Sequence, residues 1–206
     1  MGTFARTALL VGVPVLLIVG VGVGLGLNWS RLGFDGAQPL ERFEKLGGDF
    51  TLTSQFGAQT SLSQFRGKVV LLTFGYTFCP DVCPTTLAEL TRVHRKLGRD
   101  STRVQTLFIT VDPERDSAAR LKDYLSSFHP GMIGLTGPLP EISALALKYG
   151  SYFAKQESNA AKEYLMDHTA FTYLLDQEGI VRHLYHFGDG ADLIVKGVRQ
   201  LLNTGS

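Results

Sequence analysis

Two cysteines four residues apart are the side chains of this sequence best suited to chemistry. Cys79 and Cys83 are the only cysteines among its 206 residues, and they lie in the motif Cys-Pro-Asp-Val-Cys-Pro directly after the apolar run 69–74. A disulfide between them would close too short a loop to constrain the unfolded chain much, so a reactive pair is favoured over a structural cross-link. Thiolates act as nucleophiles or as soft metal ligands, and the pair alone leaves both roles open.

His168 is the residue that can decide between these roles. It comes directly before a predicted strand, 169–175, and in an α/β sheet the strand ends beside helix amino termini converge on one rim. The imidazole is therefore expected to reach the two sulfurs despite its distance in sequence. Two thiolates and one imidazole form a soft ligand set that suits copper(I) and also resembles an open zinc site. Met166 either packs or offers a thioether at the same place.

A helix that starts at the cysteine motif must position the two sulfurs. We expect it to begin near Pro80, because proline suits the first helical turn. Cys79 and Cys83 then lie on one face of this helix, whose free N–H groups and dipole stabilise thiolates. The strand before it, residues 69–75, is almost continuously apolar, which is typical of a strand covered on both faces of its sheet.

The rest of the sequence alternates between strand and helix patterns. Strands are predicted at 50–52, 59–62, 104–111, 131–136, 169–175 and 180–185, and helices from Cys83 onward and at 118–128, 140–149 and 191–202. Residues 152–163 read as an insertion. Alternating strands and helices followed by a hairpin predict an α/β sandwich with a mixed central sheet.

The amino-terminal part of the sequence predicts a membrane anchor. Residues 8–27 carry no charged side chain, and a helix of that length spans about 30 Å, the thickness of the bilayer's apolar core. The run is longer than a signal peptide usually has, so an uncleaved helix is favoured over a cleaved one. The predicted organisation is a stub 1–7, a transmembrane helix 8–27, a linker 28–48 and one domain 49–206. A net charge of +1 gives no general attraction for nucleic acid.

Three ordered motifs resemble those of one known family. They are Cys-Pro-Asp-Val-Cys-Pro at 79–84, Thr-Val-Asp-Pro-Glu-Arg-Asp at 110–116 and Asp-His-Thr at 167–169. In this respect the chain resembles the SCO/SenC family of membrane-anchored copper-binding proteins. The resemblance implies a thioredoxin-like three-layer sandwich in which Cys79, Cys83 and His168 bind copper as Cu(I) or Cu(II). It also implies copper delivery to the binuclear copper site of cytochrome c oxidase subunit II, or reduction of the cysteines of that site.

The sequence also predicts a cellular location and leaves one main alternative function open. No long Arg- and Ser-rich extension marks a mitochondrial precursor, so we expect a bacterial inner membrane protein with its domain on the periplasmic side and an upstream periplasmic copper donor. The alternative is a membrane-tethered thiol:disulfide oxidoreductase, or a redox sensor, that uses Cys79 and Cys83 as its redox pair. Redox pairs on this fold usually have two intervening residues and a nearby proline. Three intervening residues and a histidine favour a metallochaperone over an enzyme.

Several other polar residues leave two interpretations open. Asp81 and Asp167 either tune the ligands or cap backbone N–H groups. The charged segment 112–116 either faces a partner or forms a local Asp–Arg pair. His94 and His129 are expected to be solvated.

Overall fold

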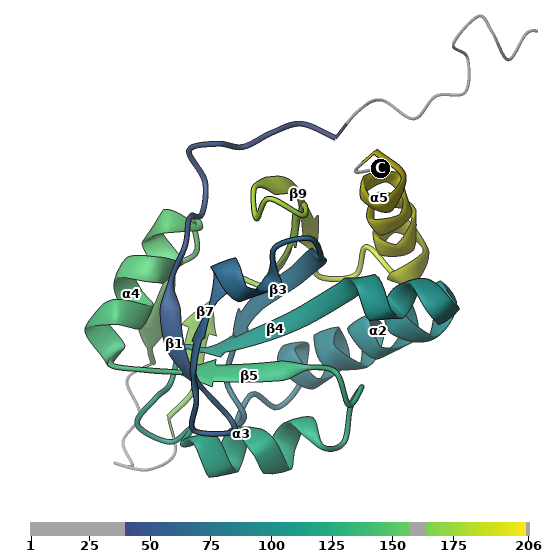
Figure 1. The fold of residues 1–206 in the computed structure, drawn as a ribbon. Helices are drawn as coiled ribbons and strands as arrows, with labels where there is room; N and C mark the ends of the chain where they lie inside the picture. The colour runs from purple at the N-terminus through teal and green to yellow at the C-terminus, as the bar shows by residue number, and fades with distance from the viewer. Residues whose placement is uncertain (1–39, 157–163, 205–206) are drawn as a thin grey trace, which may run out of the picture. The chain divides into compact units, whose positions relative to one another are not determined.

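The computed structural model describes residues 40–156 and 164–204 of the chain (Figure 1). The predicted stub 1–7, transmembrane helix 8–27 and residues 28–39 of the predicted linker lie outside these residues. Across the two described ranges, none of the helices has both the length and the apolar character needed to cross a bilayer.

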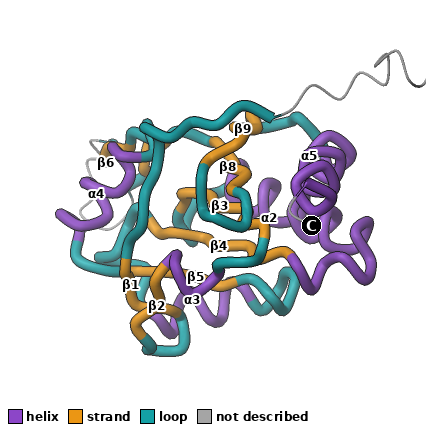
Figure 2. The backbone as a smooth tube through the Cα atoms, turned by 45° about the horizontal axis from the view of Figure 1, so that its top comes forward, coloured by secondary structure: helices purple, strands orange, loops and turns teal. Residues whose placement is uncertain are grey.

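The centre of the domain is a seven-stranded mixed sheet. Its spatial order is β2-β1-β5-β4-β3-β8-β9, as Figure 2 shows. The strands are β1 (Thr51–Ser54), β2 (Gln59–Ser61), β3 (Val69–Gly75), β4 (Val104–Thr110), β5 (Ile133–Thr136), β8 (Phe171–Leu175) and β9 (Val181–His186). β3, β4 and β5 are parallel, whereas the other neighbouring strands pair antiparallel.

Helices cover both faces of this sheet. They are α2 (Val82–Leu97), α3 (Ala118–Leu125), α4 (Leu139–Lys148) and α5 (Ala191–Thr204), with short 3-10 turns at Leu62–Phe65 and Gly98–Arg103. The β4 residue Phe108 meets Tyr124 of α3, with ring centroids 6.1 Å apart, on the face that also carries α2. Phe74 of β3 points the other way and meets Tyr149, the residue after α4, at 5.9 Å. The predicted three-layer, thioredoxin-like α/β sandwich is therefore confirmed.

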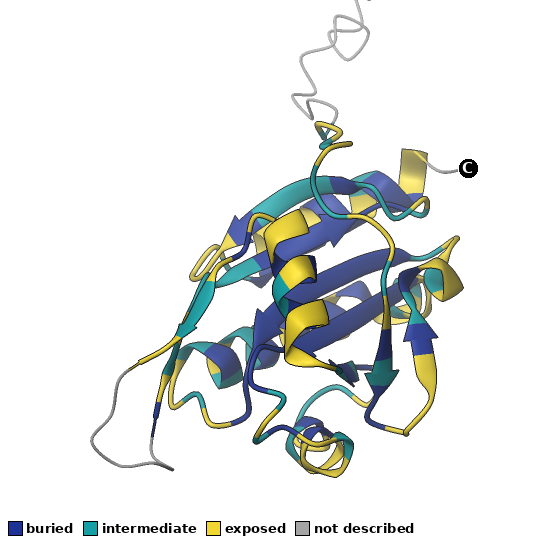
Figure 3. Cartoon of the chain, turned by 90° about the vertical axis from the view of Figure 1, so that its left-hand side faces the viewer, coloured by how far each residue is buried: buried dark blue, intermediate teal, exposed yellow. Residues whose placement is uncertain are grey.

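β3 and β4 are the innermost strands and fix the position of the site. Every residue of both strands is buried, in agreement with their nearly continuous apolar sequences (Figure 3). Their parallel register pairs Val69 with Val104 and Gly75 with Thr110. The segments that follow Gly75 and Thr110 therefore leave the sheet side by side at one edge.

The helix after the cysteine motif begins later than predicted. α2 starts at Val82, so Cys79 precedes the helix and Cys83 lies in its first turn. Pro84 also lies in that turn, where its missing N–H leaves no intrahelical hydrogen bond unmade. Gly98 ends the helix with a φ of +58°, a conformation that glycine adopts without strain.

The sequence suggested that His168 comes directly before a strand of the main sheet. The structure places it elsewhere. It ends β7 (Met166–His168), which pairs with β6 (Phe153–Lys155) in a separate two-stranded sheet and lies opposite Phe153. Thr169 extends this pairing, because its N–H donates to the carbonyl oxygen of Tyr152 and its hydroxyl accepts from the Tyr152 N–H. The predicted insertion, 152–163, thus contains β6, the strand that pairs with the strand of His168.

The described part of the chain enters the domain at the end of the sheet away from Gly75. Arg182 donates to the carbonyl oxygens of Leu40 and Glu41, at 2.6 and 2.9 Å, and the N–H of Phe43 donates to the carbonyl oxygen of Val181. Val181 pairs with Leu175, which in turn pairs with Val70 near the start of β3. One strand length therefore separates this attachment from the cysteine motif.

Leu87 on the buried face of α2 tests this packing. Its side chain is completely buried, so Leu87→Ala should lower the free energy of unfolding by about 2–5 kcal/mol through lost contacts and a residual cavity. Leu147→Ala on α4 is the matched control, because 72% of Leu147 is exposed and its removal should cost within about 0.5 kcal/mol. Urea unfolding of both variants measures the difference, and equal losses would contradict the assigned packing.

Candidate metal centre

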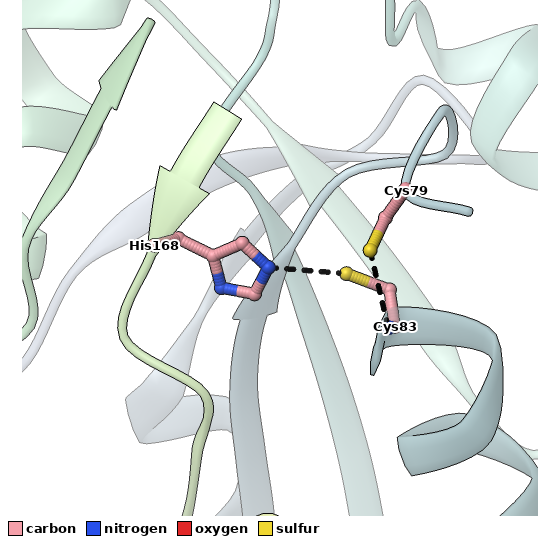
Figure 4. Close-up of side chains that lie close together, drawn as sticks. All are labelled: Cys79, Cys83 and His168. Atoms are coloured by element: carbon pink, nitrogen blue, oxygen red, sulfur yellow. Dashed lines mark hydrogen bonds between the residues drawn. The ribbon is translucent and has the colours of Figure 1, made fainter. Parts of the chain in front are cut away.

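Cys79, Cys83 and His168 converge at one point on the domain (Figure 4). One ligand atom from each residue lies within 4.8 Å of the others, and these three form the one group of at least three His, Cys, Asp or Glu side chains with such geometry in the described residues. The residues come from the turn after β3, the first turn of α2 and the end of β7. The structure therefore brings together all three residues that the sequence singled out as metal ligands.

The sulfur of Cys79 is held by the turn that links β3 to α2. The N–H of Cys79 donates to the carbonyl oxygen of Tyr76 at 3.3 Å, which closes this turn. The N–H of Cys83, at the amino terminus of α2, donates to the Cys79 sulfur at 3.3 Å. Although Cys79 lies outside the helix, its sulfur thus receives one of the free N–H groups of the helix end.

The sulfur of Cys83 depends on a glycine in β3. Cys83 is 3% exposed, and its Sγ lies 2.8 Å from the position that a Cβ atom on Gly75 would occupy. The same Cβ would lie 2.7 Å from the ring of Phe108. A side chain at position 75 would therefore compete with the sulfur for its space.

The imidazole of His168 is oriented by its own neighbours. Its Nδ1 lies 3.2 Å from the carbonyl oxygen of Thr169, which can only accept, so Nδ1 carries the proton in this hydrogen bond. Nε2 is then the ring nitrogen available to a metal, and it lies 3.3 Å from the Cys83 sulfur. The ring also packs edge-on against Tyr76 at 5.8 Å, and the hydroxyl of Tyr76 accepts from the Met166 N–H.

The two thiols have opposite acid–base character. The hydrogen bond from the Cys83 side chain lowers the pKa of Cys79, with further help from His168 and backbone N–H groups and against the effect of burial. The hydrogen bond to Cys79 and burial raise the pKa of Cys83. Both residues are free cysteines here. The half-buried Cys79 is therefore the thiolate of the pair, and Cys83 is its proton donor.

This donor set fits a single soft cation. Thiolate and imidazole ligands lie about 2.0–2.3 Å from a zinc ion, so two ligands of one ion are at most about 4.6 Å apart. The three ligand atoms already lie within 4.8 Å of one another, so small side-chain rotations suffice. Two sulfurs and one nitrogen suit copper(I) or zinc better than a hard cation.

The carboxylates beside the ligands do not contact them. Asp81 accepts a hydrogen bond from the Thr85 hydroxyl at 3.4 Å and forms no side-chain helix cap. Asp167 accepts from the amide of Gln156 at 2.6 Å. Asp112 pairs with Arg115, as one of the two interpretations held, and Asp112 is itself buried.

The expectation that His94 is solvated is wrong. Its side chain is 3% exposed, and its ring nitrogens lie 2.7 Å from the Ser101 hydroxyl and 2.8 Å from the Thr106 hydroxyl. Its ring stacks on His129, with centroids 4.0 Å apart, and burial lowers the pKa of His94 to about 4. The buried His94 and the half-buried His129 pack α2 against the loop between α3 and β5, and neither belongs to the metal centre.

Gly75 and Tyr76 shape the site from the end of β3, and neither was predicted as a site residue from the sequence. A glycine at the end of an otherwise bulky buried strand signals close approach of another group, and this signal was present in the sequence. Nothing local to Tyr76 indicated that its ring would pack against a histidine 92 positions later.

Comparison with known proteins places these features in a family. The SCO1/SenC family model matches residues 38–203. The mitochondrial SCO2 homolog of Mus musculus is 38% identical over 155 residues, which are 74% of this chain but only 61% of the mouse protein. The copper-bound structure of Bradyrhizobium japonicum ScoI is 40% identical with a TM-score of 0.70, covering 76% of this chain and 99% of that one.

The chain is also similar to a less closely related Sco protein, BsSco. BsSco, described as having a disulfide switch and as a member of the Sco family of cytochrome c oxidase assembly proteins, is 27% identical with a TM-score of 0.64. The alignment covers 80% of this chain and 97% of BsSco.

The different acidities of the two thiols can be tested by alkylation. Because the pKa of Cys79 is lowered, its thiolate persists below the usual thiol range, and iodoacetamide should modify Cys79 at a nearly constant rate from about pH 8 down to about pH 6. Cys83 should stay unmodified over this range, since its pKa is raised. Mass spectrometry of quenched samples gives both rates.

The control for this measurement is Cys83→Ala, which removes the proton donor and should make the Cys79 rate fall as pH decreases. Two cysteines that react equally and lose about tenfold in rate per pH unit would contradict the assignment.

Proposed function

Because the chain belongs to the SCO1/SenC family, we propose that it is a copper chaperone that binds one copper ion through Cys79, Cys83 and His168. The observation that carries this proposal is the convergence of two sulfurs and one imidazole nitrogen, from three separate segments, within 4.8 Å. Copper in either oxidation state, Cu(I) or Cu(II), is the cargo. The copper-bound ScoI structure of Bradyrhizobium japonicum, at 40% identity, supports this assignment.

The residues around the site suit a cargo that must be released again. Cys83 is buried, whereas Cys79 is partly exposed and is flanked by the exposed residues Phe78 and Pro80. An acceptor ligand therefore approaches from the Cys79 side, and copper leaves by exchange of ligands one at a time. The Nδ1–H hydrogen bond of His168 to Thr169 orients the ring and leaves Nε2 as the nitrogen that binds copper.

The acceptor that we propose is the binuclear copper site of cytochrome c oxidase subunit II, supplied in turn by an upstream periplasmic copper donor. Support comes from the description of BsSco as a member of a family of oxidase assembly proteins. We also propose that residues 8–27 anchor the chain in a bacterial inner membrane, with the domain on the periplasmic side. The uncharged run of residues 8–27 supports the anchor.

A second function is favoured by the unequal thiols. The Cys79 thiolate attacks one sulfur of a partner disulfide and forms a mixed disulfide, while the other partner sulfur leaves as a thiolate. Cys83 then attacks the Cys79 sulfur, which releases the partner as a dithiol and leaves a Cys79–Cys83 disulfide. Two electrons pass to the partner. The same chemistry prepares the cysteines of a copper acceptor, and it also allows the pair to sense redox conditions.

Replacement of the histidine distinguishes the two functions. Anaerobic Cu(I) titration of the wild-type chain should give one tightly bound copper, and His168→Ala should weaken binding by more than the roughly 10–100-fold that follows loss of an outer hydrogen-bond partner. His186→Ala is the matched control, because this histidine is mostly exposed and does not belong to the group of three converging ligand residues. Rapid reduction of a model disulfide that survives His168→Ala, together with unchanged copper binding, would instead favour the oxidoreductase.

The space for the Cys83 sulfur gives a second test. Gly75→Ala places a methyl group where the sulfur lies and should weaken Cu(I) binding by about tenfold or more, because the thiol must turn away from the other ligands. Gly137→Ala is the control, because its Cβ would also come within 2.8 Å of a side-chain atom, Leu52 Cδ2, and no ligand residue is among its close neighbours. Chelator competition measures both affinities, and equal values for the two variants would contradict the role of Gly75.

A further inference from the structure

Asp116 is a buried carboxylate that the proposed copper chemistry does not use. Its side chain is completely buried, and no ion pair among the described residues includes it. A carboxylate removed from water in this way is tolerated only where hydrogen-bond donors replace the lost solvent. The donors that surround Asp116 therefore indicate what it holds in place.

Three donors meet the Asp116 carboxylate, and two of them come from Thr77. The Thr77 N–H donates to Oδ2 at 2.9 Å, and the Thr77 hydroxyl donates to Oδ1 at 2.6 Å. The Thr110 hydroxyl donates to Oδ2 at 2.6 Å. The two ends of β3 and β4, which the sheet register places side by side, are thus joined through one carboxyl group.

The direction of these hydrogen bonds is fixed by further N–H groups. Arg120 Nε donates to the Thr77 hydroxyl at 3.1 Å, and the N–H of Asp112 donates to the Thr110 hydroxyl at 3.0 Å. A hydroxyl has one proton, so each threonine oxygen that accepts these N–H groups gives its own proton to Asp116. Both carboxylate oxygens must therefore act as acceptors, which an amide at this position cannot do.

Thr77 connects this network to the metal centre. It lies two residues before Cys79, inside the turn that the hydrogen bond from the Cys79 N–H to the Tyr76 carbonyl closes. Asp116 holds Thr77 by its backbone and by its side chain at once, so rotation of the turn breaks two hydrogen bonds to a buried group. Phe78, the next residue, is also flanked by the guanidinium groups of Arg115 and Arg120, at 4.6 and 4.9 Å from its ring centroid.

We propose that Asp116 is a positioning residue of the metal centre, whose carboxylate fixes the turn that presents the Cys79 sulfur to Cys83 and His168. It acts through Thr77 and touches none of the three ligands. The inference rests on the proposed copper function in its metal-binding form. Because the turn is already fixed, little further ordering of the backbone is needed when the ligands bind a cation. Loss of the carboxylate therefore weakens metal binding and changes the relative stability of the dithiol and disulfide forms of Cys79 and Cys83.

Two variants of the full chain test this proposal, each with its own comparison. Asp116→Asn keeps the shape but replaces one acceptor oxygen by a donor, and Thr77→Val removes the hydroxyl that Asp116 binds. Thr77→Ser restores that hydroxyl. Thr110→Val is the matched control, because it also removes one hydroxyl bond to Asp116 but lies outside the cysteine turn.

Two measurements are made on each variant. Competition with a chromogenic Cu(I) chelator gives the copper affinity, and equilibration with glutathione in the absence of metal gives the midpoint potential of Cys79 and Cys83. Asp116→Asn and Thr77→Val should lower the affinity by about tenfold and shift the potential. Thr77→Ser and Thr110→Val should stay within about twofold of the wild-type affinity, with an unchanged potential.

Several outcomes would overturn the proposal. Asp116 would be a purely structural residue if the folded Asp116→Asn and Thr77→Val variants kept the wild-type copper affinity and potential. The same conclusion would follow if Thr110→Val lost as much copper affinity as these two variants. If Asp116→Asn does not fold, the contrast between Thr77→Val and Thr77→Ser decides. If the wild-type chain fails to bind copper, the copper function is wrong, and the metal-free potentials still decide the role of Asp116.

Discussion

The parallel pairing of β3 with β4 is the constraint on which the rest of the structure depends. It places Gly75 beside Thr110, so that the cysteine turn and the charged turn after β4 leave the sheet together. Gly75 then leaves room for the Cys83 sulfur, and Tyr76 packs against His168. A metal centre built from loops alone would lack these fixed neighbours. Here two fully buried strands supply them, and the cost of ordering the site is already met in folding.

Most of the framework could be predicted from the sequence because it depends on local pattern. The apolar runs of β3 and β4 are long enough to identify buried strands, and the spacing of Leu87, Leu90 and Val93 identifies the inner face of α2. The three candidate ligands could also be named, since two cysteines in one motif narrow the choice of a third soft ligand. The strands and helices that were predicted agreed with the structure to within a few residues, whereas β6 and β7 were not predicted.

The details that the sequence could not provide all depend on long-range contacts. The start of α2 at Val82 and not near Pro80 follows from the turn that Thr77 and Cys79 form against other segments. The strand of His168 pairs with residues that read only as an insertion. Asp116 lies 39 residues from its partner Thr77, and an acidic residue within a charged segment gives no sign that it will be buried. Local propensity contains no information about such partners.

The attachment of the chain at Leu40 and Glu41 has a mechanical consequence. A force applied to the chain at this point is received by Arg182 and by the backbone of Val181, at the outer strand of the sheet. Along the strand direction, the seven residues of β3 separate this attachment from the cysteine turn. Across the sheet, β9 and β8 lie between the attached segment and β3. Tension on the leading segment would therefore load its hydrogen bonds to β9 before it strained the ligands, so the copper-binding geometry is shielded from a pull on the chain.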